Sequence, residues 1–285
     1  MPHAAKPDGS GTEATLGAPV RLGALDLEAH LRDPTRKQAF VTPMFDVIAP
    51  RYDDFTRLFA FGMDAGWKRD AIAAAVAEWP DAGRGGAASA TMPRAAFRTA
   101  LDLASGTGDL AVGLARAVPG LRVTALDASP RMVDAADQRL SSRDADVAAR
   151  VVTMVGDMNA LSLPDASMDL VTSGYGLRNV PDAAQAVREM RRVLRPGGRL
   201  VLLDFYRPES DLWRAVLLRY LHVAGNAVGW WWHRDPVVYG YIARSIDHFV
   251  SWQRCSTMLE ANGFRVHRVT RYLGGGVARH EAVAE

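Results

Sequence analysis

The chain has 285 residues, of which 48% are hydrophobic and 23% charged, a composition typical of one globular domain with short appendages. This excludes a wholly disordered, collagen-like or coiled-coil protein. The formal net charge of +2 gives no reason to expect a nucleic acid as partner. The basic residues are 31 arginines and only three lysines, Lys6, Lys37 and Lys68, a bias that we attribute to genome composition.

A single cysteine, Cys255, excludes an intrachain disulfide and a metal cluster built from thiolates. The histidines show no metal-ligand spacing with carboxylates, so we predict no metal site. Residues 1–15 lack the apolar stretch of a secretory signal. The apolar window 212–232 contains two arginines, a histidine and an asparagine, too many polar groups for an ordinary membrane span. We therefore expect a cytoplasmic protein.

Composition and periodicity divide the chain into four segments. Residues 1–38 are rich in Ala, Gly, Pro and charged side chains and predict a disordered tail. Apolar residues at three- and four-residue steps predict a helical cap over residues 39–79. The Gly/Ala/Pro-rich residues 80–98 predict a flexible loop. Residues 99–285 predict the main domain, with a helical insertion at about 207–248.

After residue 98 short apolar runs alternate with amphipathic helices. The runs that predict strands are 99–104, 122–127, 149–155, 168–173 and 199–205. The helices between them are predicted at 110–117, 130–140 and 183–194. Because parallel strands need crossover connections, this alternation predicts an α/β fold with a doubly wound, mostly parallel sheet.

A glycine-rich loop follows the first predicted strand and opens a helix. In Ser105-Gly106-Thr107-Gly108-Asp109 the glycines allow a ligand to approach the backbone closely. Asp127 stands 21 residues after Gly106, at the end of the next apolar run. A doubly wound sheet places this carboxylate beside the loop, where it can accept hydrogen bonds from two ribose hydroxyls. The spacing predicts a cofactor site that contains Gly106, Gly108 and Asp127.

Two cofactors compete for this loop. Gly106-x-Gly108-x-x-Ala111 formally satisfies the dinucleotide fingerprint. Asp102 in the strand and Asp109 at the helix start would repel a pyrophosphate, whereas S-adenosylmethionine carries an ammonium and a sulfonium that carboxylates attract. The alternative interpretation makes Asp109 a helix N-terminal charge and Asp102 a satisfied buried group. The constellation as a whole favours S-adenosylmethionine.

Two later segments support the same cofactor. In Gly156-Asp157-Met158, after the third run, we expect Asp157 to bind the adenine amine and Met158 to pack against the ring; a solvated loop carboxylate is the alternative. The turn Leu194-Arg195-Pro196-Gly197-Gly198 ends a helix and leads into a strand. Such a turn rarely accompanies dinucleotide enzymes.

Three further segments carry a resemblance to a known family. They are Phe45-Asp46-Val47-Ile48-Ala49-Pro50-Arg51-Tyr52-Asp53, Phe61-Gly62-Met63-Asp64-Ala65-Gly66-Trp67-Lys68-Arg69 and Gly176-Leu177-Arg178-Asn179-Val180. With the glycine loop and the turn before the fifth strand, they make residues 40–280 resemble the ubiquinone/menaquinone biosynthesis C-methyltransferases, the UbiE/MenG family. The resemblance implies a Rossmann-like methyltransferase sheet, mostly parallel with an antiparallel last strand, and S-adenosylmethionine as cofactor.

The resemblance also implies individual cofactor contacts. They are Thr107, Asp127, Asp157, Met158 and Tyr52, the last folding over the cofactor from the amino-terminal helix. The family's serine two residues before the Gly-Leu-Arg-Asn run is replaced by Gly174, so that Ser173 or the Gly174 backbone would have to substitute. The carboxyl-terminal residues 274–280 also depart from the family pattern, which bears on the acceptor more than on the cofactor.

The family reaction is methylation of a polyprenyl quinol ring, either demethylmenaquinol or a benzoquinol of the ubiquinone pathway. We expect Arg178 and Asn179 to be catalytic and to hold the acceptor oxygen, with Arg178 stabilising phenolate charge. The alternative is that these residues only start the helix that follows, with Asn179 or Asp182 as its cap. Other acceptors on the same scaffold, such as a phenol, sterol or polyketide, and a non-catalytic binding protein remain as alternative functions.

A lipophilic acceptor requires an apolar surface, and residues 210–232 carry an apolar stripe along half of a predicted helix. Residues 207–272 contain nine arginines against five acidic residues, whereas residues 100–170 contain six arginines against ten. The basic part predicts peripheral contact with the inner face of the membrane, and a solvated surface is the alternative. A homodimer is a further hypothesis.

Overall fold

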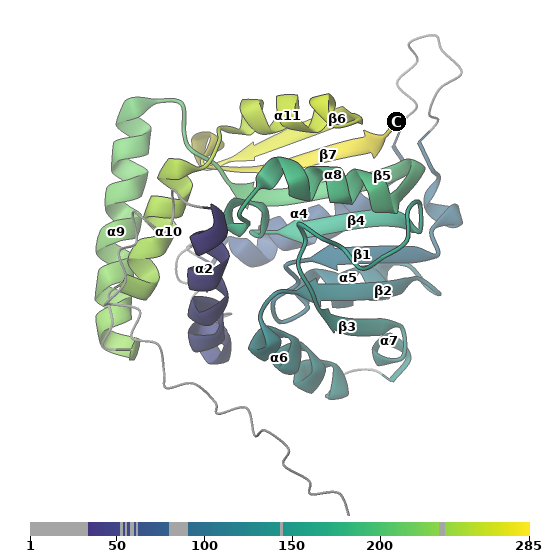
Figure 1. Cartoon of the computed structure of the whole chain (residues 1–285), viewed down its shortest axis with the longest axis horizontal. Coiled ribbons are helices and arrows are strands. Elements are labelled where there is room, and N and C mark those ends of the chain that lie inside the picture. The colour runs from purple at the N-terminus through teal and green to yellow at the C-terminus, as the bar shows by residue number, and fades with distance from the viewer. Residues whose placement is uncertain are drawn as a thin grey trace, which may run out of the picture.

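The computed structural model describes residues 34–51, 54, 56–57, 60, 62–79, 91–142, 145–233 and 237–285. Within these ranges seven strands form one sheet in the order β3-β2-β1-β4-β5-β7-β6 (Figure 1). The strands are β1 Thr99–Leu103, β2 Arg122–Asp127, β3 Val151–Val155, β4 Met168–Gly174, β5 Leu194–Phe205, β6 Phe264–Tyr272 and β7 Val277–Ala284. Only β7 runs antiparallel to its neighbours β5 and β6. The predicted fold class is confirmed.

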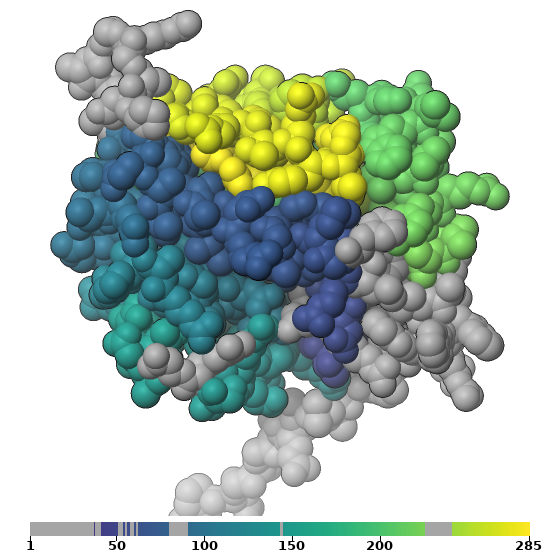
Figure 2. All heavy atoms as spheres, turned by 180° about the vertical axis from the view of Figure 1, so that it is seen from behind, coloured from purple at the N-terminus to yellow at the C-terminus, as the bar shows by residue number. Residues whose placement is uncertain are grey.

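Helices cover both faces of the sheet. In Figure 1, α8 and α11 lie in front of it and α4 and α5 behind it. The helices are α4 Asp64–Val76, α5 Asp109–Ala117, α6 Pro130–Ser141, α7 Ala145–Ala148, α8 Ala183–Val193 and α11 Trp252–Ala261. Seen from behind in Figure 2, the blue segment that contains α4 adjoins the yellow strands β6 and β7. Helix α4, expected in a separate cap, thus packs directly on the sheet.

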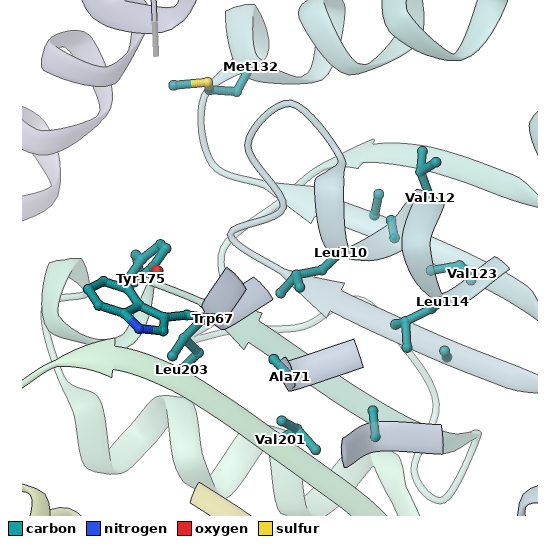
Figure 3. Close-up of a cluster of buried hydrophobic side chains, with 14 of the residues drawn as sticks. Trp67, Ala71, Leu110, Val112, Leu114, Val123, Met132, Tyr175, Val201 and Leu203 are labelled. Atoms are coloured by element: carbon teal, nitrogen blue, oxygen red, sulfur yellow. The ribbon is translucent and has the colours of Figure 1, made fainter. Parts of the chain in front are cut away.

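Strand β5 shows how the sequence builds the two core layers. Its side chains alternate, so that Val201 and Leu203 join the cluster under α4 and α5 while Leu200 and Leu202 join the cluster under α8 and α11. All four are at most 1% exposed. Figure 3 shows Trp67 of α4 in the first cluster, together with Leu203. This two-sided burial holds the strand ends that carry the candidate site in fixed positions.

Three helices gather beyond the carboxyl ends of the parallel strands (Figure 1). They are α2 Pro34–Ile48, α9 Asp211–His233 and α10 Val237–His248. Helix α2 begins at Pro34, so the last residues of the segment expected as a tail are helical; residues 1–33 lie outside the described part of the chain. The helical insertion expected at about 207–248 corresponds to α9 and α10. None of the described helices is long and apolar enough to cross a membrane.

The segment expected as a flexible loop, 80–98, is described from residue 91 onward, and this part is packed. Phe97 is 1% exposed, and the Met92 N–H donates to the Gly197 carbonyl at 3.0 Å. The fully buried guanidinium of Arg199 lies 4.9 Å from the Phe97 ring and donates to the Met92 carbonyl at 2.8 Å. Residues 91–98 are thus a loop with one short 3₁₀ helix, η3 Arg94–Ala96, that is anchored to the start of β5.

Candidate functional site

Two adjoining cavities lie at the carboxyl ends of β1, β2 and β4. The larger measures about 660 Å³ including its open mouth, and the smaller about 330 Å³. They share Ala104, Gly106, Gly174 and Tyr175, so the glycine loop and the loop after β4 form the boundary between them. The two cavities lie at the edge where doubly wound sheets bind ligands.

The glycine loop owes its shape to left-handed backbone conformations. Gly106 has φ 53° and Gly108 has φ 83°, values that side chains disfavour. Gly108 directly precedes α5, and the Gly106 N–H donates to the Asp127 carboxylate at 2.8 Å. The loop therefore curls around the space into which a ligand would bind, as the sequence predicts.

Asp127 holds the loop and faces the larger cavity. Its two carboxylate oxygens accept from the N–H groups of Gly106, at 2.8 Å, and Ser129, at 2.9 Å. Burial raises the pKa of Asp127, with a smaller contribution from the charge of Asp46. Each oxygen has more than one lone pair, so further donors such as ribose hydroxyls can still be accommodated. The structure places Asp127 beside the glycine loop, where the sequence predicts it.

Asp102 is a buried carboxylate with protein partners and a ligand-facing position. It is 1% exposed and accepts from the Thr172 hydroxyl at 2.8 Å and from the Ala111 N–H, in the first turn of α5, at 3.1 Å. It also lines the smaller cavity. Burial raises its pKa to about 7. Asp102 is thus a satisfied buried group, as the alternative interpretation has it, and it also lines the cavity; its contact with a ligand cation stays a prediction.

The other carboxylate of the loop, Asp109, is already paired with cations of the protein. Lys68 Nζ lies 2.9 Å and Arg139 Nη2 lies 2.6 Å from its oxygens. Arg139 also donates to the Thr107 hydroxyl at 3.0 Å. The charge of Asp109 is therefore balanced within the protein. Among the described residues, the other carboxylate of this cavity, Asp102, forms no ion pair.

The Gly156-Asp157-Met158 segment lines the larger cavity, as expected for an adenine site. Asp157 accepts from the Asn159 N–H at 2.8 Å, and Met158 is 6% exposed. Gly156 is close to β2, since a Cβ atom there would lie 2.9 Å from Leu126 Cδ1. These contacts fix the segment beside Asp127, and its role toward adenine stays a prediction.

Gly174, which replaces the family serine, lies at the boundary of both cavities. Ser173 is buried and lines neither cavity, and its hydroxyl lies 2.9 Å from the position that a Cβ atom on Gly176 would take. A Cβ atom on Gly176 would lie 2.4 Å from the Ala104 Cβ. The loop after β4 thus lies against the glycine loop. Of Ser173 and Gly174, only Gly174 lines the cavities.

Arg178, expected to hold the acceptor oxygen, forms a buried ion pair instead. Its Nη1 lies 2.7 Å from Asp204 Oδ1 and 2.7 Å from the Tyr175 carbonyl. Its backbone N–H donates to the same carboxylate at 3.1 Å, and its guanidinium lies 5.4 Å from the Phe205 ring. Arg178 is 6% exposed and lines neither cavity. In this structure it braces the loop against the end of β5.

Asn179 does reach the larger cavity. It ends the 3₁₀ helix η4, Leu177–Asn179, and its amide donates to the Tyr175 carbonyl at 2.9 Å. Its Oδ1 accepts from the Tyr241 hydroxyl of α10 at 3.1 Å. The cap of α8 is Asp182, which accepts from the Gln185 N–H at 2.9 Å. Asn179 is therefore not a helix cap, and its side chain is oriented by α10 and by the loop.

Several site residues escape prediction from the sequence. Asp46, within the first family segment, accepts from the Ser129 hydroxyl at 2.5 Å and so fastens α2 to the start of α6. Lys37 Nζ donates to the Arg178 carbonyl at 2.8 Å. The rarity of lysine in the sequence could have pointed to Lys37, since Lys37 and Lys68 both lie at the site. Tyr52 lies outside the described residues.

The carboxyl-terminal departure from the family pattern lies apart from both cavities. The 3₁₀ helix η5, Leu273–Gly275, packs against α9 and α11, and a Cβ atom on Gly274 would lie 3.1 Å from Trp213 Nε1. Neither cavity is lined by these residues. Across the described ranges, no group of three or more His, Cys, Asp or Glu side chains could hold a metal ion.

The strand order, the glycine loop after β1 and the carboxylate at the end of β2 define the class of S-adenosylmethionine-dependent methyltransferases. Solved structures agree on the fold. A SAM-dependent methyltransferase of Thermotoga maritima matches 85% of this chain and 99% of its own with a TM-score of 0.56 at 16% identity. The mitomycin 7-O-methyltransferase MmcR matches 95% of this chain and 74% of its own with a TM-score of 0.52 at 20% identity.

The chain belongs to the ubiE/COQ5 methyltransferase family, whose sequence profile matches residues 33–284. A demethylmenaquinone methyltransferase of Deinococcus radiodurans is 37% identical over 84% of this chain and 89% of its own length. The ubiquinone/menaquinone biosynthesis C-methyltransferase UbiE of Geobacter sulfurreducens is 33% identical over 81% of this chain and 83% of its own. The corresponding UbiE of Caulobacter vibrioides is 31% identical over 92% and 97%. The predicted family is confirmed.

Proposed function

We propose that the protein methylates a ring carbon of a polyprenyl quinol, with S-adenosylmethionine as methyl donor. The observation that carries the proposal is the Gly176–Val180 loop, which brings Asn179 to the cofactor cavity. Relatives that share more than 30% of the sequence are named for demethylmenaquinone or for both ubiquinone and menaquinone biosynthesis. The acceptor is then demethylmenaquinol or a benzoquinol of the ubiquinone pathway.

The residues of the two cavities fit this cofactor. Bound S-adenosylmethionine supplies an electrophilic methyl group on a positively charged sulfur. Asp127 would accept hydrogen bonds from its ribose, and Asp157 and Met158 would contact its adenine in the larger cavity. Thr107 and Asp102 line the smaller cavity, where Asp102 is suited to a ligand ammonium because no cation of the described residues pairs with its buried carboxylate. A pyrophosphate would meet the two carboxylates of Asp102 and Asp109 there.

The acceptor side needs groups that make a ring carbon electron-rich. Removal of a phenolic proton does so, because the negative charge of the oxygen is delocalised into the ring. Asn179, already oriented by Tyr241 and Tyr175, would position the acceptor oxygen. Arg178 would act behind it as a positioning residue, through its ion pair with Asp204. This positioning role takes the place of the direct contact between Arg178 and the acceptor that the sequence predicts.

The test is methylation of defined quinols by the purified protein. We expect reduced demethylmenaquinone or the demethylated benzoquinol to gain one methyl group on a ring carbon, detected by mass spectrometry and NMR. Deletion of the gene should in parallel cause a demethylated quinone to accumulate in whole cells. An unchanged quinone profile, together with no turnover of either quinol, would contradict the proposal.

We also propose that the protein attaches peripherally to the inner face of the membrane, from the cytoplasm, through α9. On this helix Leu212, Val216 and Val223 are 77%, 49% and 60% exposed. A shallow, almost wholly apolar depression includes Val216, Val223 and the stem of Arg219. An exposed apolar stripe flanked by arginine suits the interface of a bilayer with anionic lipids.

Vesicle flotation tests this attachment. We expect the protein to float with vesicles that contain phosphatidylglycerol, and the triple variant Leu212→Ser, Val216→Ser, Val223→Ser to remain at the bottom. The alternative hypothesis is that two copies of the chain form a homodimer through the same apolar stripe. Sedimentation analysis in the absence of lipid decides between them: a dimer that the triple variant converts to a monomer, without flotation, would contradict membrane attachment.

A further inference from the structure

Lys37 lies on α2 one turn before residues that line the cofactor cavity, and its amine contacts the loop that forms part of the same cavity. Lys37, Val41 and Phe45 follow one another at four-residue steps and so share one face of the helix. Val41 and Phe45 line the larger cavity. One turn further toward the amino terminus, Lys37 Nζ reaches the loop after β4 and donates to the Arg178 carbonyl at 2.8 Å. The next residue of that loop, Asn179, lines the cavity.

The surroundings of Lys37 disfavour its charged form relative to an ordinary lysine, so that a larger fraction of the amine is neutral at a given pH. Burial and the guanidinium of Arg178 lower the pKa of Lys37 to about 8, and the carboxylate of Asp204 opposes this in part. From α10, Tyr241 contributes a buried phenol whose pKa is raised, so it stays uncharged. An arginine at this position would remain protonated, because its pKa exceeds about 12. A chain with 31 arginines nevertheless has a lysine here.

We propose that Lys37, as a neutral amine, is the base that accepts the phenolic proton of the methyl acceptor. The phenolic O–H bond breaks, an N–H bond forms on Nζ, and the electron pair stays on the oxygen, from which it is delocalised into the ring. A neutral amine has two N–H groups and one lone pair, so it can donate to the Arg178 carbonyl while it accepts this proton. The ammonium formed lies beside the phenolate and later releases the proton to solvent. This inference rests on the proposed quinol methylation.

Lys37→Arg separates proton transfer from mere positioning. It retains a cation that can donate to the Arg178 carbonyl, but it cannot act as a base. We expect the variant to bind S-adenosylmethionine within three-fold of the wild type and to lose kcat by roughly 100-fold, the scale of general-base catalysis. The wild-type rise of kcat with pH, centred near 8, should shift to higher pH in the variant. Lys6→Arg, which precedes the family match, serves as the matched control.

The two proposals fail in different ways. No turnover of any quinol by the wild type would overturn the proposed function. Turnover by the wild type, with Lys37→Arg retaining kcat within three-fold and an unchanged pH profile, would overturn the role of Lys37. Lys37→Met should lose activity as Lys37→Arg does, and a Lys37→Met variant with wild-type kcat would also contradict the inference.

A titration that needs no turnover gives a second test. Protein labelled with ¹³C and ¹⁵N at lysine contains only three such side chains, and the signal missing in Lys37→Arg identifies Lys37. We expect this signal to titrate with a midpoint near 8, without cofactor or acceptor. A midpoint at about 10.4, the value of an ordinary lysine, would show that the amine is charged at working pH and would overturn the proposal.

Discussion

Arg178 and Asp204 form an ion pair of 2.7 Å in which both side chains are buried. The pair joins the loop after β4 to the end of β5, since the Arg178 backbone N–H also donates to the Asp204 carboxylate. Through the Tyr175 carbonyl, which accepts from both Arg178 and Asn179, the pair fixes the side chain that faces the cavity. The ion pair therefore contributes to function by fixing the shape of the site.

Arg178→Met should be strongly destabilising, because it leaves a buried carboxylate without its cation. We expect a loss of about 3–5 kcal/mol in the free energy of unfolding, measured by chemical denaturation. The loss should become smaller as the pH falls. With its cation removed, Asp204 has a folded-state pKa above the unfolded value, so protonation at low pH favours the folded variant.

The double variant Arg178→Met, Asp204→Asn distinguishes the effect of the buried charge on stability from the effect of packing. The single amide oxygen can still accept one of the two backbone hydrogen bonds that Asp204 receives from Arg178 and Phe205, and no uncompensated charge remains. We expect the double variant to regain at least about 1 kcal/mol over Arg178→Met alone. A double variant less stable than either single variant would contradict the ion-pair explanation.

Asp127→Asn tests the ribose contact. Charge-assisted hydrogen bonds contribute about 1.5–3 kcal/mol each, so the Kd for S-adenosylmethionine should rise roughly 10- to 100-fold in calorimetric titration. Asp146→Asn, at an exposed carboxylate paired with Arg150, is the matched control and should bind as the wild type does. NAD should bind neither protein. Tight NAD binding by the wild type would refute the cofactor assignment.

Asp102 should make cofactor binding pH-dependent. Its pKa of about 7 in the free protein means that it is partly protonated at neutral pH. A bound ammonium favours the ionised form and lowers this pKa, so affinity should be constant above pH 7 and fall as the pH decreases below it. Calorimetry at pH 6.5 in buffers of different ionisation enthalpy should detect proton release on binding. Asp102→Asn should abolish the release, and an equal release from that variant would assign it to another group.

Gly176→Ala should damage the site by a purely steric route. Its Cβ would lie 2.4 Å from the Ala104 Cβ, so the loop after β4 must move away from the glycine loop. We expect at least ten-fold weaker cofactor binding and a lower melting temperature. Gly66→Ala, in helix α4 with no atom within 4 Å of the new Cβ, is the control and should gain about 0.5–1 kcal/mol. Equal binding by both variants would contradict the close contact of the two loops.

The sequence by itself determined the first five strands, the helices between them and the cofactor edge, but not the bounds of β6 and β7. Alternating apolar residues specify which face each strand buries, and glycines with φ near 53° and 83° mark the loop where the chain must turn. Asp127 reaches that loop because parallel strands end at a common edge. These features depend on local periodicity and on topology, both of which are present in the order of the residues.

Only the tertiary structure decided what the charged side chains of the site do. Arg178, assigned to the acceptor from its motif, turns inward because Asp204 from β5 and the Phe205 ring receive it. Asp109 is balanced by Lys68 of α4 and Arg139 of α6, and Lys37 meets the loop after β4 from α2. Each of these partners is distant in the chain. The protonation and the direction of a buried charge depend on which groups surround it in space, and no local pattern in the sequence encodes that environment.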